Sequence, residues 1–281
     1  MAVLSIQSHV SYGHAGNSSS VFPLRRLGLD VWPVYTVCFA HHTGYGNPSG
    51  HIFSGDVIQE VVSGIKVVAN MQECQALMTG YLGAKSTGNF ILNEIKQLKK
   101  INPKIIYSCD PVMGDIGRGF FTSKEIQSFF NDELKDSFDI LTPNLFELEF
   151  LSGLKVKDID TAITAARTLI TRDTQFIIVT SYQSDDSCLT VLLISSDECL
   201  SISTPEIKFE RPAVGTGDLF HALFLGNYLQ TMNKKSSLEK AVNSIYDIIQ
   251  ATKVSKSYEL KLIDNQNFIV NPKSEYKVKN I

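Results

Sequence analysis

Two glycines and an aspartate stand immediately before the most apolar stretch of this chain. The residues are R-P-A-V-G-T-G-D at 211–218, followed by L-F-H-A-L-F-L-G at 219–226. Gly215 and Gly217 remove two side chains from a turn at a predicted helix start, so backbone N–H groups can converge there on an anion. Such a site suits a phosphoryl group in transfer, with Asp218 facing an acceptor hydroxyl. Taken alone, however, a G-x-G-D turn is more often an ordinary helix start whose aspartate is a capping residue.

The elements that position these residues alternate along the chain. Short apolar runs alternate with stretches of helical period, which predicts a doubly wound α/β fold with a mostly parallel sheet flanked by helices on both faces. The predicted strands cover 2–6, 30–39, 76–79, 104–109, 139–141 and 175–179, with 189–195 and 198–204 as an antiparallel pair. The predicted helices cover 16–28, 56–71, 88–100, 145–151, 160–172, 218–229 and 237–256.

No linker, repeat or low-complexity tract interrupts the chain, so we expect residues 1–281 to form a single domain. The segment from Asn265 is expected to be the most loosely held. Polar residues follow the predicted strands, and ligands in open α/β sheets bind beyond the carboxyl ends of strands. We therefore expect these residues to converge on one cleft. They are residues 7–9, 40–46, 80–83, 110–115 and 142–147.

Composition narrows the class of partner. The 26 basic and 29 acidic residues give a formal net charge of −3, which offers no electrostatic footprint for nucleic acid and no polybasic patch for a membrane. Five cysteines are scattered without C-x-x-C spacing, so neither a disulfide framework nor a zinc site is indicated. The N-terminus lacks the pattern of a secretion signal. We expect a cytoplasmic protein that binds small molecules.

Four motifs in a fixed order identify a family resemblance. They are S-H-V-S-Y-G-H-A-G-N at 8–17, D-P-V-M-G-D at 110–115, T-P-N-L-F-E-L-E at 142–149 and G-T-G-D at 215–218. The third and fourth are typical of the ribokinase-like superfamily. The first, together with V-W-P-V-Y-T-V at 31–37, resembles its pyridoxal kinase branch, most closely the bacterial pyridoxal-specific type. The resemblance covers nearly the whole chain. It implies a ribokinase-like fold, a homodimer, and ATP-dependent phosphorylation of pyridoxal to pyridoxal 5′-phosphate.

The resemblance also implies roles at the transfer site. Gly215, Thr216 and Gly217 would form the anion hole, and Asp218 would accept the proton of the 5′-hydroxyl. A carboxylate at a helix N-terminus should have a lowered pKa. We therefore expect Asp218 mainly to orient the hydroxyl and to take its proton late.

Mg²⁺ and ATP are the expected cofactor and co-substrate, and a monovalent cation is common in the family. We place Asp110 and Glu147 near Mg²⁺ and the phosphates, through water, with Thr142 beside them. Each acid also has an ordinary interpretation, a turn at Asp110-Pro111 or a first-turn acid at Glu147. Asp115 and Glu149 are weaker candidates, for which a solvated surface position is favoured.

The resemblance assigns two further groups of residues. The pyridoxal ring is expected to contact Ser8, His42, Thr43, Gly44 and Tyr81, with His41 structural, although Tyr81 alone is equally compatible with a half-buried core position. The adenine and ribose are expected near Thr180, Thr204, Pro205, Glu206 and Ile207. Many bacterial members carry a lysine after the strand at 175–179, whereas this chain has Thr180 and Ser181. The segment 115–121 has two glycines and resembles a closing loop, with Arg118 as a phosphate contact, or it is an ordinary mobile loop.

Two alternative functions remain open from the sequence. One is a kinase whose main acceptor is another B6 vitamer or hydroxymethylpyrimidine. The other is a non-catalytic carrier or sensor of B6 vitamers on the same scaffold. The presence of Asp218, Asp110 and Glu147 beside two motif glycines argues against the carrier, because a protein that only binds needs no acid to activate an acceptor.

Overall fold

The computed structural model describes residues 1–134, 137–185 and 187–281, and a ten-stranded sheet forms its centre. The strand order is β12-β11-β10-β9-β8-β5-β4-β1-β2-β3. The five pairings among β1, β2, β4, β5, β8 and β9 are parallel, and the outer strands pair antiparallel. A second small sheet pairs β6 with β7. The mostly parallel sheet is confirmed.

The strands are β1 (Ala2–Tyr12), β2 (Asp30–His41), β3 (Gly50–Ile52), β4 (Cys74–Thr79), β5 (Ile106–Cys109), β6 (Gly114–Asp115), β7 (Gly119–Phe120), β8 (Ile140–Leu141), β9 (Phe176–Asp185), β10 (Cys188–Ile194), β11 (Cys199–Pro205) and β12 (Lys279–Asn280).

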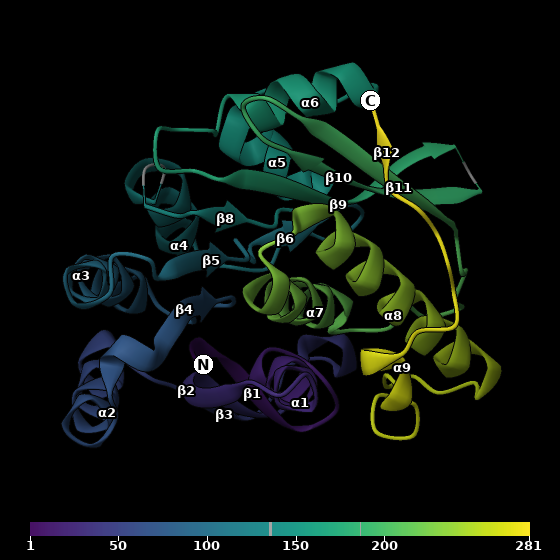
Figure 1. Cartoon of the computed structure of the whole chain (residues 1–281). Coiled ribbons are helices and arrows are strands. Elements are labelled where there is room, and N and C mark those ends of the chain that lie inside the picture. Colours follow the sequence, from purple (N-terminus) through teal and green to yellow (C-terminus); the bar gives the residue numbers. More distant parts are fainter. Residues whose placement is uncertain (135–136, 186) are drawn as a thin grey trace.

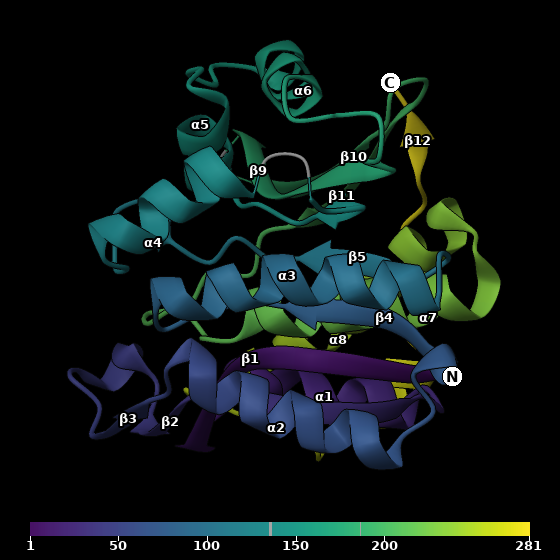
Figure 2. The same ribbon diagram turned by 90° about the vertical axis from the view of Figure 1, so that its left-hand side faces the viewer.

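Helices cover both faces of this sheet. Figures 1 and 2 show α2 to α6 on one face and α1, α7, α8 and α9 on the other. The helices are α1 (Asn17–Arg26), α2 (Gly55–Val68), α3 (Lys85–Ile101), α4 (Lys124–Ser128), α5 (Leu145–Ser152), α6 (Ile159–Arg167), α7 (Thr216–Thr231), α8 (Lys234–Val254) and α9 (Asn267–Val270), with single turns η1 (Thr43–Tyr45), η2 (Met71–Glu73) and η3 (Phe129–Glu133).

Two hydrophobic cores explain why the central strands are apolar along their length. Ile177 and Val179 of β9 belong to the core that α2 to α6 cover, whereas Phe176 and Ile178 belong to the core under α1, α7 and α8. Successive side chains of a strand point to opposite faces, so a strand buried on both faces has no polar alternation. Helix α7 is buried from Leu219 to Leu229 because it lies against the sheet and packs on α1 and α8.

The carboxyl ends of the parallel strands meet at one edge. The backbone N–H of Asp110 donates to the Thr79 carbonyl oxygen (2.9 Å), and that of Thr142 donates to the Cys109 carbonyl oxygen (2.9 Å). The ends of three neighbouring strands are therefore tied together. The expected convergence of Asp110 and Thr142 is confirmed.

Several local predictions differ from the structure. Strand β1 runs to Tyr12, so Ser8 lies inside a strand, at a bulge between Gln7 and His9, and does not follow one. Residues 124–133, for which no element was predicted, form α4 and η3. Helix α4 is five residues long, too short to show a helical period in the sequence.

The expectation that the segment from Asn265 is loosely held is wrong. Ile269 of α9 is 1% exposed, and β12 pairs with β11 at the edge of the sheet (Figure 1). The Asp247 carboxylate of α8 accepts the Ser274 N–H (3.1 Å) and the Ser274 hydroxyl (2.6 Å). The tail is held by partners far away in sequence, which its own composition does not reveal.

Candidate active site

The turn at 215–218 has the geometry that its glycines predict. Gly215 is the N-cap of α7 and is left-handed, with φ 85° and ψ 7°. The first three N–H groups of α7, from Thr216 to Asp218, have no hydrogen-bond acceptor in the described part of the chain. Unpaired amides at the positive end of a sixteen-residue helix form an anion site.

Gly215 is also required for close packing. A Cβ at this position would overlap the His14 carbonyl oxygen, which belongs to the loop between β1 and α1. The Ser19 hydroxyl donates to the Gly215 carbonyl oxygen (2.9 Å), and the Ser20 hydroxyl donates to that of Asp218 (3.1 Å). The start of α1 therefore fixes the anion-binding turn.

Three carboxylates lie around this turn. Asp110 and Glu147 are buried, at 7% and 2% exposure, and Asp218 is half-buried. A Cβ added to Gly217 would lie 3.6 Å from Asp110 Oδ2, so Asp110 faces the turn from the end of β5. No lysine, arginine or histidine of the described residues forms an ion pair with any of the three.

Burial dominates the electrostatics of these acids. It raises the pKa of Asp110 well above its usual value, and the nearby charges of Glu147 and Asp218 add to the effect. It raises the pKa of Glu147 to about 8, against backbone N–H groups that stabilise the anion. It also raises the pKa of Asp218 to about 6, against the lowering effect of the Gly16 N–H. The expectation of a lowered pKa for Asp218 is wrong, because desolvation outweighs the helix terminus.

The geometry of Glu147 combines both interpretations offered by the sequence. It forms a capping box with Asn144, accepting the Asn144 N–H (3.0 Å) and donating its own N–H to the Asn144 side chain (2.9 Å). The other oxygen accepts the Met113 N–H (2.9 Å). Glu147 is thus a first-turn acid that also faces the cavity between β5 and α7.

These carboxylates fit a divalent cation held mainly through water. Uncompensated buried acids gain from a nearby cation, and Mg²⁺ retains several waters and needs few protein ligands. The described residues contain no group of three His, Cys, Asp or Glu side chains arranged to hold a metal ion directly. The donor set therefore favours indirect coordination by Asp110 and Glu147.

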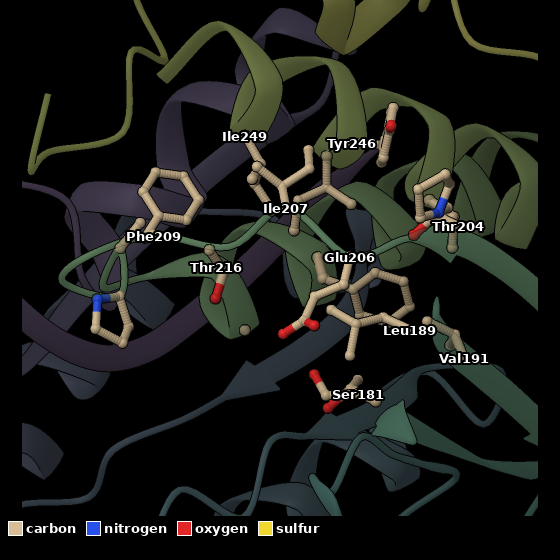
Figure 3. Close-up of a pocket in the computed structure, with 18 of the residues that line it drawn as sticks. Ser181, Leu189, Val191, Thr204, Glu206, Ile207, Phe209, Thr216, Tyr246 and Ile249 are labelled. Atoms are coloured by element: carbon tan, nitrogen blue, oxygen red, sulfur yellow. The ribbon is translucent and has the colours of Figure 1, made fainter. Parts of the chain in front are cut away.

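Two adjoining cavities meet at the head of α7. One, of about 500 Å³, is the more polar of the two, contains the three carboxylates and is called the polar cavity below. The other, of about 590 Å³, is largely apolar, and side chains from β10, α8 and the segment after β11 surround it (Figure 3). Five residues line both cavities: Thr180, Pro212, Ala213, Thr216 and Gly217.

The residues expected near adenine and ribose are together in the apolar cavity. Thr180, Thr204, Pro205, Glu206 and Ile207 all line it. Figure 3 shows the Ile207 and Ile249 side chains close together, with the Tyr246 ring nearby on α8. A flat heteroaromatic base suits such an apolar space.

Of the five residues expected at the pyridoxal ring, two line the polar cavity and three do not. Thr43 and Gly44 line the polar cavity, whereas Ser8, His42 and Tyr81 are absent from the linings of both cavities described above. Ser8 is buried next to Gly16. Tyr81 is half-buried, and its backbone carbonyl oxygen accepts the Thr36 hydroxyl (2.6 Å).

The two histidines have different surroundings. His42 is 5% exposed, and its ring stacks on Tyr45 with 4.8 Å between ring centroids. The His41 Nδ1 is 3.0 Å from the His42 carbonyl oxygen. The structural position expected for His41 agrees with this contact, and His42 lies behind the cavity wall.

The segment 115–121 forms the β6–β7 hairpin beside the polar cavity. Asp115 and Arg118 line the cavity, and an Arg118 nitrogen donates to the Thr43 hydroxyl oxygen (3.4 Å). Glu149 instead pairs with Lys155 (2.7 Å) and lies outside the cavity lining.

Sequence reasoning missed a cluster on the opposite wall. An Arg211 nitrogen donates to the Gly44 carbonyl oxygen, and the guanidinium lies 3.7 Å from the centroid of the Tyr258 ring. Arg211 and Tyr258 line the polar cavity, and Glu259 lies directly behind it. Arg211 stands in the same run as Gly215 and was available as a signal. Tyr258 and Glu259 belong to no recognised motif.

Comparisons with known proteins match this chain along its length. The phosphomethylpyrimidine kinase family model matches residues 49–261. Pyridoxal kinase PdxY of Corynebacterium diphtheriae is 35% identical over 284 residues, and that of Leifsonia xyli is 34% identical, with all of both chains covered in each case. The structure of Leishmania donovani pyridoxal kinase with ADP and pyridoxamine matches with a TM-score of 0.93 and 27% identity, covering 100% of this chain and 99% of that one. The expected ribokinase-like arrangement is thereby confirmed.

Proposed function

This chain belongs to the phosphomethylpyrimidine kinase family, together with the pyridoxal kinases that it matches over its whole length, and on that premise we propose that it phosphorylates pyridoxal with ATP. The γ-phosphoryl group passes to the 5′-hydroxyl, a P–O bond to ADP breaks, and the hydroxyl loses its proton. The products are pyridoxal 5′-phosphate and ADP.

The observation that carries this proposal is the junction of the two cavities. An apolar space suited to a base and a polar space lined by acids share Thr216 and Gly217 at the head of α7. A nucleotide whose base occupies the first directs its phosphates to the unpaired amides of the turn. An acceptor in the second then lies beside Asp218, in line for transfer.

Asp218 is suited to receive the hydroxyl proton. With a pKa raised to about 6 by burial, it is mostly ionised at neutral pH and is a stronger base than an ordinary aspartate. The amides of the turn stabilise the charge that develops on the transferred group. The chain thus supplies an anion hole and a proton acceptor next to each other.

We place Mg²⁺ beside Asp110 and Glu147, held through water. When bound with ATP, the ion neutralises phosphate charge. The two buried carboxylates supply the negative potential that attracts it, since no basic side chain of the described residues pairs with them. Turnover should therefore require added Mg²⁺ and stop with excess EDTA.

The family match leaves a second acceptor class to test. The matching model describes a phosphomethylpyrimidine kinase, and the Leishmania donovani enzyme was solved with pyridoxamine and with pyridoxine. Hydroxymethylpyrimidine and the other B6 vitamers carry a comparable hydroxymethyl group on a heteroaromatic ring. Relative rates on these alcohols determine the main substrate.

A homodimer in a reducing compartment such as the cytoplasm completes the proposal. Val57, Val61 and Val68 form an exposed apolar stripe on α2, and Ile52 of the edge strand β3 is also exposed. Among the described residues, Cys38, Cys74, Cys109 and Cys199 form no disulfide, as expected in a reducing environment. No helix among the described residues is long and apolar enough to cross a membrane. Analytical ultracentrifugation should give twice the chain mass.

The kinase proposal is tested by incubating the purified protein with Mg²⁺-ATP and one acceptor at a time. The acceptors are pyridoxal, pyridoxine, pyridoxamine and hydroxymethylpyrimidine, and the phosphorylated product is quantified by chromatography. We expect the highest rate with pyridoxal. Asp218→Asn, which keeps the side-chain volume, should lower the rate on the order of 10²–10³-fold. Pyridoxal binding without product from any acceptor would instead support a non-catalytic carrier.

A further inference from the structure

Glu259 lies in the segment after α8 and contacts two distant loops of the polar cavity. Its Oε1 accepts hydrogen bonds from His42 Nε2 (2.8 Å) and from the Tyr45 hydroxyl (2.8 Å). Its Oε2 accepts the backbone N–H of His14 (2.9 Å). One side chain, 15% exposed, thus joins three parts of the chain.

We propose that Glu259 is a positioning residue. It holds the loop at residues 42–46, called the acceptor loop below, in a fixed position relative to the anion-binding turn at residues 215–218. The inference rests on the proposed function, because it assigns Glu259 to the acceptor side of that reaction. Glu259 lines neither cavity and acts through His42 and His14.

On the acceptor side, Glu259 is connected to Gly44 by hydrogen bonds through the His42 ring. The Gly44 N–H donates to His42 Nδ1 (3.2 Å), so the neutral ring carries its proton on Nε2, where it donates to Glu259. The carboxylate therefore fixes both the tautomer and the ring plane of His42. That ring in turn caps η1, the single turn that presents Thr43 and Gly44 to the polar cavity.

On the phosphate side, Glu259 is connected to Gly215 through the backbone of His14. Glu259 holds the His14 N–H, and the carbonyl oxygen of the same residue packs so closely on Gly215 that no Cβ fits. Displacement of His14 would change the space next to the turn that binds the phosphoryl group. Glu259 thus couples the two sides between which transfer takes place.

The neighbouring contacts support an ionised, rigid Glu259. Burial alone would raise the pKa of Glu259, but hydrogen bonds from Tyr45, His42 and His14 lower it overall, so the group is a carboxylate at neutral pH. Tyr258 meets the Tyr45 ring edge-on at 4.8 Å and carries the Arg211 guanidinium. Tyr258 and Glu259, which are adjacent in sequence, therefore both contact Tyr45 of the acceptor loop.

The test compares three variants with the wild type in the full chain. Glu259→Gln keeps the volume but leaves one oxygen for three donors. Tyr45→Phe removes a single hydrogen bond to Glu259. Glu239→Gln is the matched control, because Glu239 also fixes the C-terminal region, accepting the Val278 N–H (3.0 Å), but lies outside both cavity linings. Calorimetry gives Kd for pyridoxal and for ADP, steady-state assays give both KM values, and thermal melts report folding.

We expect Glu259→Gln to weaken pyridoxal binding roughly tenfold, and Tyr45→Phe roughly threefold. ADP lacks the γ-phosphoryl group that the turn receives, so its Kd should stay within about twofold of wild type, whereas displacement of the turn through His14 should lower kcat of Glu259→Gln. Glu239→Gln should leave both constants unchanged. A purely structural Glu259 would affect both ligands equally, or neither, and either result would overturn the inference.

Should Glu259→Gln not fold, Tyr45→Phe carries the same comparison. A wild type that binds pyridoxal without phosphorylating it contradicts the proposed function, while the ratio of the two Kd values still decides the role of Glu259. A wild type that does not bind pyridoxal contradicts both.

Discussion

At the scale of the residue, Asp218 shows how burial and helix charge compete. The sequence places a carboxylate in the first turn of a helix, where the dipole should stabilise the anion by less than about 1 kcal/mol at an exposed position. In the folded protein, desolvation is larger and raises the pKa to about 6. The motif therefore predicted the position of this acid in the first turn of a helix correctly, but it predicted the wrong direction of the pKa shift, because burial depends on parts of the chain that are distant in sequence.

The raised pKa has a consequence for stability. An acid near 3.8 in the unfolded chain and about 6 when folded stabilises the protein fully only below the lower value, and this contribution is lost as the pH rises through 6. Asp218→Asn should therefore raise the stability of the ligand-free protein on the order of 2 kcal/mol at pH 8, and hardly at all at pH 4. Thermal melts between these pH values measure the difference. Asp264→Asn, on the exposed surface, should show none of this trend, and a pH-independent gain for Asp218→Asn would contradict the assigned shift.

At the scale of the element, the turn before α7 depends on one glycine more than on helix propensity. The two-glycine motif predicted the anion site from sequence alone. What it could not predict is the packing of His14 against Gly215, since that contact needs the loop after β1 to reach the head of α7.

Two glycines with the same φ of +85° allow conformation and contact to be separated. Gly28 has open space where a Cβ would lie, whereas a Cβ at Gly215 would overlap the His14 carbonyl oxygen. Gly28→Ala should cost only left-handed strain, about 1–2 kcal/mol, and leave kcat near wild type. Gly215→Ala should in addition displace the turn and lower kcat/KM at least about tenfold. Equal kinetic effects in the two variants would show that the contact with His14 is unimportant for the site.

At the scale of the whole molecule, the order of strands and helices was predictable because buried apolar runs and helix periods are local signals. Asp110 and Thr142, which follow predicted strands, were expected at the same edge of the sheet and meet there. The docking of the C-terminal region was not foreseeable, because its hydrogen-bond partners lie on α8 and β11.

A substitution of Asp247 tests how much the docking of the C-terminal region contributes to stability. Its buried carboxylate accepts two hydrogen bonds from Ser274 and one from the Lys273 N–H. Asp247→Ala should lower the free energy of unfolding by about 2–4 kcal/mol, because three part-buried hydrogen bonds lose their charged acceptor. Asp264→Ala, which removes only an exposed ion pair with Lys261, should cost less than about 1 kcal/mol. Urea denaturation compares the two, and similar midpoints would mean that the tail contributes little.

The position of Tyr258 and Glu259 also bears on how the protein is made. The N-terminal part of a chain leaves the ribosome first, so all strands of the central sheet except β12, the anion-binding turn and most of both cavities are synthesised before these two residues. Until the segment after α8 has emerged, the acceptor loop lacks the carboxylate that His42, Tyr45 and His14 share. A nascent or prematurely terminated chain that stops before Glu259 would therefore fold much of its core and still lack an assembled acceptor site, which confines catalysis to polypeptides that include this segment.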